Sequence, residues 1–108
     1  MDRTKPVVVK LEGSEKYQRL LPGAPVTCGM KSGHVCLKPG ESVGQHSTDS
    51  REEAIVILEG CAQIIAGGAV SATASAGQLV YIPPHTDHDL RNSGNGILRY
   101  VYVVAPVI

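Results

Sequence analysis

The most constraining feature of the chain is a series of short Val- and Ile-rich segments separated by glycine, proline, asparagine and serine. None of the segments carries a sustained helical period, and β-branched side chains favour strands. The segments are Pro6–Leu11, Gly33–Lys38, Ala54–Leu58, Cys61–Ala66, Leu79–Ile82 and Ile97–Ala105. Phenylalanine and tryptophan are absent, so Val, Ile, Leu and Ala must build most of the core. This pattern predicts an all-β sandwich or barrel.

Glycine-containing sequences between the segments indicate where the chain turns. Glu59-Gly60 and Gly67-Gly68 are typical of tight hairpins, because glycine readily adopts the positive φ that such turns need. A further turn is expected over Ser93–Gly96, before the last strand. The one predicted helix spans Ser14–Leu21, with Ser14 as the N-cap and Pro22-Gly23 as its end.

Length and charge narrow the classes of function. A chain of 108 residues has room for one domain, and ten basic and ten acidic side chains cancel to a net charge of zero. We therefore expect no nucleic-acid and no membrane partner, because no positive surplus is present to attract phosphates or anionic lipid. The first residues lack the apolar stretch of a signal peptide, and the three cysteines form no C-x-x-C pair. We interpret the cysteines as reduced, buried thiols and expect a cytoplasmic protein.

Two imidazoles and a carboxylate fall where strands can bring them together. Glu53 begins a strand whose neighbours on the same face, Ile55 and Ile57, are apolar. A carboxylate directed at an apolar interior is costly without a cationic or metallic partner. If His46 and His88 converge on Glu53, they form a three-ligand site with open positions, which suits Fe(II) and also Mn, Ni, Cu or Zn.

These residues lie within two stretches of regular spacing. In the first stretch Gly40 is followed after five residues by His46, then by Thr48, by Glu53, and after six more residues by Gly60. The second stretch contains Gly77, Pro83, His85, His88 and Asn92.

The two stretches resemble the two sequence motifs of the cupin superfamily, and the chain is similar to its small, single-domain conserved-barrel members. The resemblance implies an antiparallel jelly-roll β-barrel over the single domain 1–108. Residues 1–32 are then an N-terminal arm with the first strands, and residues 33–105 are the barrel with both motifs. Cupins of this size commonly pair, so the resemblance also implies a homodimer, in which the apolar last strand and the Pro6–Leu11 segment are buried.

By position in the motifs, the resemblance implies that His46, Glu53 and His88 ligate a divalent transition metal (Fe, Mn, Ni, Cu or Zn). Thr48 stands where the first motif has a second histidine, and His85 stands where the second motif has a glycine. A neutral hydroxyl is a poor metal ligand, so the loss of one imidazole weakens the predicted site unless another group replaces it. Thr48 and His85 are therefore further candidates for the metal or the pocket.

A site without metal is the alternative. The histidines could instead be hydrogen-bonded to each other and to Glu53, which would hold the strands in register without an ion. Glu53 could also pair with Arg51, Arg91 or Arg99.

Specificity would then depend on the side chains that line the pocket. We expect Ile55, Ile57, Leu90 and Tyr102 to line it. We expect His34, which matches no motif position, to be a packed or half-exposed strand residue.

Two hypotheses of function follow. The first is a small metal-dependent cupin that acts on a small polar metabolite by dioxygenase- or isomerase-type chemistry, with Glu53 as a catalytic base. The alternative is a non-catalytic cupin barrel that binds a sugar or another metabolite. Fold alone does not choose between them.

Overall fold

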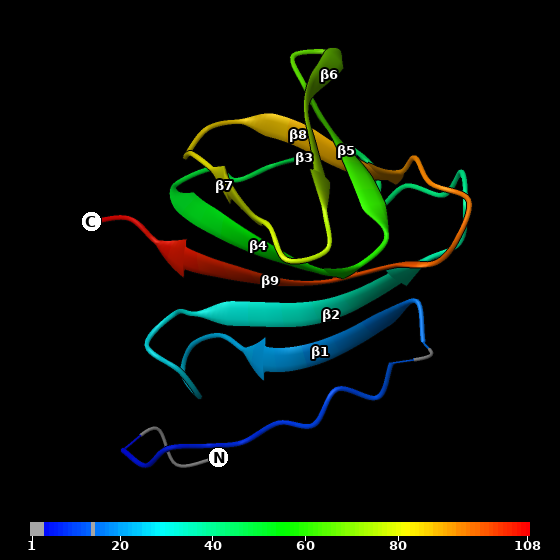
Figure 1. Ribbon diagram of the computed structural model, residues 1–108. Coiled ribbons are helices and arrows are strands. Elements are labelled where there is room, and N and C mark those ends of the chain that lie inside the picture. Colours follow the sequence, from blue (N-terminus) through cyan, green and yellow to red (C-terminus); the bar gives the residue numbers. More distant parts are fainter. Residues whose placement is uncertain (1–3, 14) are drawn as a thin grey trace.

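Two antiparallel sheets make up the computed structural model, which describes residues 4–13 and 15–108 (Figure 1). The strands are β1 (Tyr17–Pro22), β2 (Lys31–Leu37), β3 (His46–Ser47), β4 (Arg51–Glu59), β5 (Cys61–Ala66), β6 (Ala69–Ser75), β7 (Leu79–Ile82), β8 (Asp87–Asn92) and β9 (Leu98–Pro106). One sheet has the order β1-β2-β9-β4-β7 and the other has the order β3-β8-β5-β6. The predicted antiparallel jelly-roll fold is confirmed. Across the described ranges no helix occurs that could span a membrane.

The core lies between the two sheets and follows from strand alternation. On β4, Ile55 and Ile57 are buried while Val56 and Leu58 are exposed. Successive side chains of a strand point to opposite faces, so every second residue of each sheet reaches the interior. The largest fully buried apolar side chains are Leu37, Ile55, Ile57, Leu90 and Leu98. As the composition predicted, aliphatic residues dominate this core.

The predicted turns are present where glycine is needed. Gly60 joins β4 to β5 with a φ of 86°. A Cβ atom at this position would collide with the backbone carbonyl of Ile97, which comes from the loop before β9. Gly67 and Gly68, also at positive φ, join β5 to β6. These turns fix which strands become neighbours.

The predicted helix over Ser14–Leu21 is wrong. Most of that segment belongs to β1, which pairs with β2 from Tyr17 opposite Val35 to Pro22 opposite Lys31. Ser14, the expected N-cap, lies outside the described residues. One or two isolated helical turns are marginal, whereas a strand at the edge of an existing sheet gains ladder hydrogen bonds.

The predicted strand over Pro6–Leu11 is also absent. This segment has no strand partner, and it runs past β1 (Figure 1). Gln18 holds it, because its Nε2 donates to the Lys10 carbonyl at 2.9 Å and its Oε1 accepts from the Glu12 amide at 2.8 Å. One glutamine therefore holds this valine-rich segment in place, although the segment joins neither sheet.

The three cysteines are unpaired. Their predicted burial is wrong for Cys28 and Cys61, which are exposed, while Cys36 is half-buried.

Candidate metal centre

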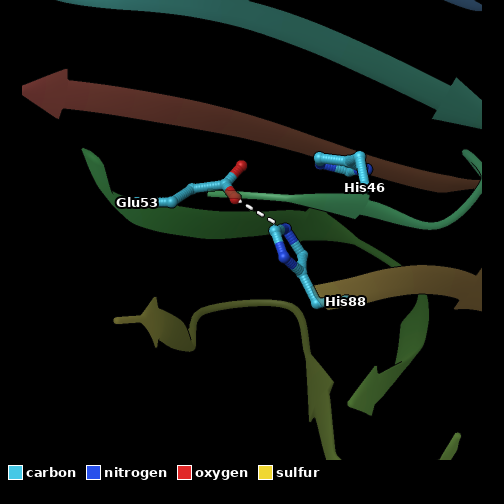
Figure 2. Close-up of side chains that lie close together, drawn as sticks. All are labelled: His46, Glu53 and His88. Atoms are coloured by element: carbon cyan, nitrogen blue, oxygen red, sulfur yellow. Dashed lines mark hydrogen bonds and ion pairs between the residues drawn. The ribbon is translucent and has the colours of Figure 1, made fainter. Parts of the chain in front are cut away.

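His46, Glu53 and His88 meet at the inner surface of the barrel (Figure 2). His46 on β3 lies directly opposite His88 on β8, and the centroids of their rings are 4.3 Å apart. Glu53 approaches from β4 of the other sheet. One potential ligand atom from each residue lies within 4.8 Å of the others. The structure thus brings together the three residues that the motif spacing singled out.

His88 and Glu53 are in direct contact. His88 Nε2 lies 2.8 Å from Glu53 Oε1, and both residues are buried. Burial alone would lower the pKa of His88. The hydrogen bond to Glu53, the carbonyl of Thr86 and the Glu53 charge outweigh this, so the pKa of His88 is raised above its ordinary value. The carboxylate is therefore paired with an imidazole and not with an arginine.

Backbone carbonyls orient both imidazoles. His46 Nδ1 lies 3.0 Å from the Gly44 carbonyl, and His88 Nδ1 lies 3.0 Å from the Thr86 carbonyl. Since a carbonyl can only accept, each Nδ1 carries a proton and donates it. In the neutral rings Nε2 is then the free lone pair, which is the arrangement found in metal-binding histidines.

The tautomer with the proton on Nδ1 determines what His88 presents to Glu53. A neutral His88 would turn the lone pair of Nε2 toward a carboxylate oxygen only 2.8 Å away. Two lone pairs at this distance require a proton or a cation to be shared between them. Two imidazole nitrogens and one carboxylate therefore fit a divalent transition metal, and the raised pKa of His88 shows the same attraction for positive charge.

Thr48 does not offer a free ligand atom. It is buried, and its hydroxyl donates to the Pro83 carbonyl at 2.7 Å and accepts from the Thr86 amide at 3.1 Å. The hydroxyl thus connects the loop between β3 and β4 to the loop between β7 and β8, which belongs to the second motif. Thr48 contributes to the cavity wall and to loop position, in the place where the family motif has an imidazole.

His85 lies away from the three-residue group. Its side chain is exposed, and it adopts a φ of 54° in the loop before β8. Its backbone amide donates to the Asp49 carbonyl at 2.7 Å. His85 is therefore neither in the cavity lining nor among the grouped ligand atoms.

A cavity of about 410 Å³ opens at the three-residue group. Of the residues predicted to line it, Ile55, Leu90 and Tyr102 do so, whereas Ile57 is packed in the core below. Sequence reasoning missed several lining residues, including Arg19, Val35, Lys31, Arg51, Tyr100 and Val104. For some of them parity was an available signal, because Arg51 shares a face with Glu53 and Tyr100 shares a face with Tyr102.

One wall of the cavity carries a pair of tyrosines. The hydroxyls of Tyr17 and Tyr102 are 2.7 Å apart, and their rings are stacked with centroids 6.3 Å apart. Burial and the hydrogen bond to Tyr17 raise the pKa of Tyr102 well above its ordinary range. Gly33 makes room for this ring, since a Cβ there would lie 2.7 Å from the Tyr102 hydroxyl. The pair presents two hydrogen-bonded phenol hydroxyls to the cavity.

His34 is a packed strand residue, as expected, and it does not line the cavity. Arg99 Nε donates to His34 Nε2 at 3.3 Å, and the same arginine pairs with Glu59 at 3.4 Å. Burial, with the Arg99 charge, lowers the pKa of His34. Its Nδ1 has no hydrogen-bond partner among the residues that the structure describes.

Comparisons with known proteins agree with the fold. The family model of the cupin domain matches residues 33–104. A cupin 2 conserved-barrel protein from Salinispora arenicola is 24% identical, with a TM-score of 0.72 over 95% of this chain and 87% of the other.

Two further solved structures are similar. A cupin family protein with a double-stranded β-helix fold from Methanocaldococcus jannaschii is 20% identical, with a TM-score of 0.74 over 94% of this chain and 91% of the other. A predicted oxalate decarboxylase from Thermotoga maritima is 20% identical, with a TM-score of 0.67 over 92% and 100% of the two chains. No curated protein matches the chain in sequence.

Proposed function

The chain belongs to the cupin domain family, and we propose that it is a metal-dependent enzyme acting on a small polar metabolite. The observation that carries the proposal is the set of His46, Glu53 and His88, whose ligand atoms lie within 4.8 Å of one another. Both imidazoles donate Nδ1–H to backbone carbonyls, which leaves Nε2 of each ring for a metal. Similarity to a predicted oxalate decarboxylase supports a small polar substrate.

A divalent Fe, Mn, Ni, Cu or Zn ion held by these residues supplies Lewis-acid or dioxygen-activating chemistry. Glu53 is the only carboxylate among the described residues that line the cavity, so it is the catalytic base of the proposal. Leu90, Ile55 and Val35 give the cavity dry walls, which strengthen polar contacts within it.

Elemental analysis of the tag-free protein tests this proposal. We expect near-stoichiometric Fe, Mn, Ni, Cu or Zn in the wild type and its loss in the double variant His46→Ala, His88→Ala. The matched control is His85→Ala, which removes an exposed imidazole outside the group and should leave the metal content unchanged. Absence of metal from wild-type protein, even after incubation with each ion, would refute a metal-dependent function.

A non-catalytic binding barrel is the second candidate, and a specific contact favours it. With a proton on Nε2, His88 donates to Glu53 at 2.8 Å and both side chains are satisfied, and the Thr48 hydroxyl is held by Pro83 and Thr86. A site of this kind can stay in place without an ion. If His88→Ala abolishes metal binding but leaves the affinity for a bound metabolite intact, the binding barrel is the better description.

We further propose a homodimer formed by the outer face of the five-stranded sheet. Val56, Leu79 and Tyr81 lie next to one another on β4 and β7, and 41%, 67% and 57% of their respective surfaces are exposed. Adjacent exposed apolar side chains are typical of interfaces between subunits. Light scattering coupled to size-exclusion chromatography should give a dimer for the wild type and a monomer for Leu79→Glu.

A further inference from the structure

Three basic side chains line the same cavity as the candidate metal centre. Arg19 belongs to β1, Lys31 to β2 and Arg51 to β4, so they are brought together only by the fold. Glu53 is the one acidic residue with them among the described residues of the lining. The cavity therefore combines three positive charges with one negative charge.

Strand register places these cations at the same end of the sheet as Glu53. Lys31 is paired with Val104, and Val104 is paired with Glu53, so the three residues form one row across β2, β9 and β4. Arg51 precedes Glu53 by two residues and thus shares its face. Arg19 lies opposite Gly33 in the neighbouring row. Arg19 and Lys31 are exposed and Arg51 is half-buried, while Val35, Ile55 and Leu90 form the apolar part of the lining.

None of the three cations has an acidic side-chain partner among the described residues. In residues 4–13 and 15–108, neither an ion pair nor a side-chain hydrogen bond involves Arg19, Lys31 or Arg51. The Glu53 carboxylate is directed to His88 instead. Unpaired like charges around one hollow repel each other and create a positive potential inside it.

The positive charge of the cavity contrasts with the net charge of the whole chain, which is zero. Ten basic and ten acidic side chains balance overall, yet three of the basic ones and only one of the acidic ones line this cavity. The remainder of the protein then carries seven basic and nine acidic residues, a surplus of negative charge. The positive charge of the cavity is thus a local property of this site.

We propose that the cavity binds a small organic anion whose carboxylate or phosphate group is held by Arg19, Lys31 and Arg51. The apolar side chains enclose the carbon skeleton, and the far end of the molecule reaches His46, Glu53 and His88. This orientation toward the metal centre rests on the proposed function, whereas the preference for an anion rests on the cations alone. A volume of about 410 Å³ lies within the range of cavities that bind small molecules.

Calorimetric or NMR titrations with two pairs of probes test the inference. Succinate is compared with its neutral analogue succinamide, and glycerol 3-phosphate is compared with glycerol. We expect at least one anion to bind about tenfold or more tightly than its neutral analogue. Comparison of the affinities for succinate and glycerol 3-phosphate shows whether the cavity prefers a carboxylate or a phosphate group. Binding of that anion should weaken as sodium chloride is added.

Charge-neutralising variants locate the binding group. Arg19→Gln, Lys31→Gln and Arg51→Gln should each weaken the binding of the preferred anion by about tenfold. Arg91→Gln and Lys38→Gln are matched controls, because both side chains are exposed and lie outside the cavity lining. Thermal unfolding of each variant checks that it folds. The salt dependence of the wild type provides a second readout that needs no substitution.

The titrations are performed on metal-free and metal-loaded wild type and on the His46→Ala, His88→Ala variant. Anion binding in the double variant, lost in Arg51→Gln, supports the inference even if the metal-dependent function fails. Equal affinity for anionic and neutral probes, or equal weakening in the control variants, overturns it. In that case normal metal content in the wild type would leave the proposed function standing.

Discussion

Thr48→Val gives a sharp test of how the loops around the site are held. Valine has nearly the shape of threonine, but it lacks the hydroxyl that donates to the Pro83 carbonyl and accepts from the Thr86 amide. Thr86 in turn offers its carbonyl to His88 Nδ1. The substitution therefore removes two hydrogen bonds and loosens the backbone that orients one candidate ligand.

The size of the effect follows from these contacts. The two bonds, 2.7 and 3.1 Å long, involve a buried side chain. Each contributes about 1 kcal/mol, and the unsatisfied groups left behind add to the loss, so we expect Thr48→Val to lower the free energy of unfolding by about 1–3 kcal/mol. For a domain of this size, a loss of about 2 kcal/mol lowers Tm by about 8–16 °C.

Urea denaturation of the metal-free protein measures this loss. Thr73→Val is the control, because the Thr73 side chain is exposed on β6 and forms no hydrogen bond with another described residue. Affinity for Zn²⁺, measured by competition with a chromophoric chelator, should fall about tenfold in Thr48→Val. Thr48→Ser keeps the hydroxyl and should retain most of that affinity. A Thr48→Val protein as stable as Thr73→Val would refute the reasoning.

Three further predictions concern protonation. In metal-free protein, Glu53→Gln should lower the pKa of His88, because it removes the negative charge that raises this pKa and replaces a charge-assisted hydrogen bond with a neutral one. An unchanged pKa in an NMR titration of the imidazole would contradict this. As pH is lowered, metal affinity should start to decrease while the pH is still above 6.5, because protons compete for His88, whose pKa is raised above that value. Metal-competition assays at a series of pH values check this. Burial lowers the pKa of His34 in the folded protein, so as pH falls His34 is protonated in the unfolded state before it is protonated in the folded state. The contribution of neutral His34 to folding stability is therefore present above pH 6.5 and is lost as pH falls below that value. Urea denaturation across pH should therefore show a smaller loss in His34→Gln than in wild type; equal losses would contradict this.

Much of the fold was predictable because strand periodicity is a local property. The segment Leu79–Ile82 is a strand with the predicted bounds, and Cys61–Ala66 likewise. The segments at the edge were not predicted correctly. Tyr17–Pro22 is a strand only because β2 offers it a ladder, whereas Pro6–Leu11 is rich in β-branched valine but has no strand partner. Pairing depends on residues that are distant in sequence, and a local pattern carries little information about them.

The candidate site divides in the same way. The motif spacing singled out His46, Glu53 and His88, and the structure groups them. The motif spacing did not indicate that the Thr48 hydroxyl would form hydrogen bonds with the backbone of the second motif's loop, or that His85 would be exposed. Those outcomes depend on how two loops meet.

The sequence by itself predicted an all-β sandwich or barrel, because side-chain alternation is a property of single strands. Its resemblance to the cupin motifs added the antiparallel jelly-roll barrel and the side chains that could bind a metal. Only the tertiary structure decided that Arg19, Lys31 and Arg51 share one cavity with that group. These residues come from three different strands, whose order β1-β2-β9-β4 is set by long-range pairing. The electrostatic character of the cavity is therefore a property of the assembled sheet.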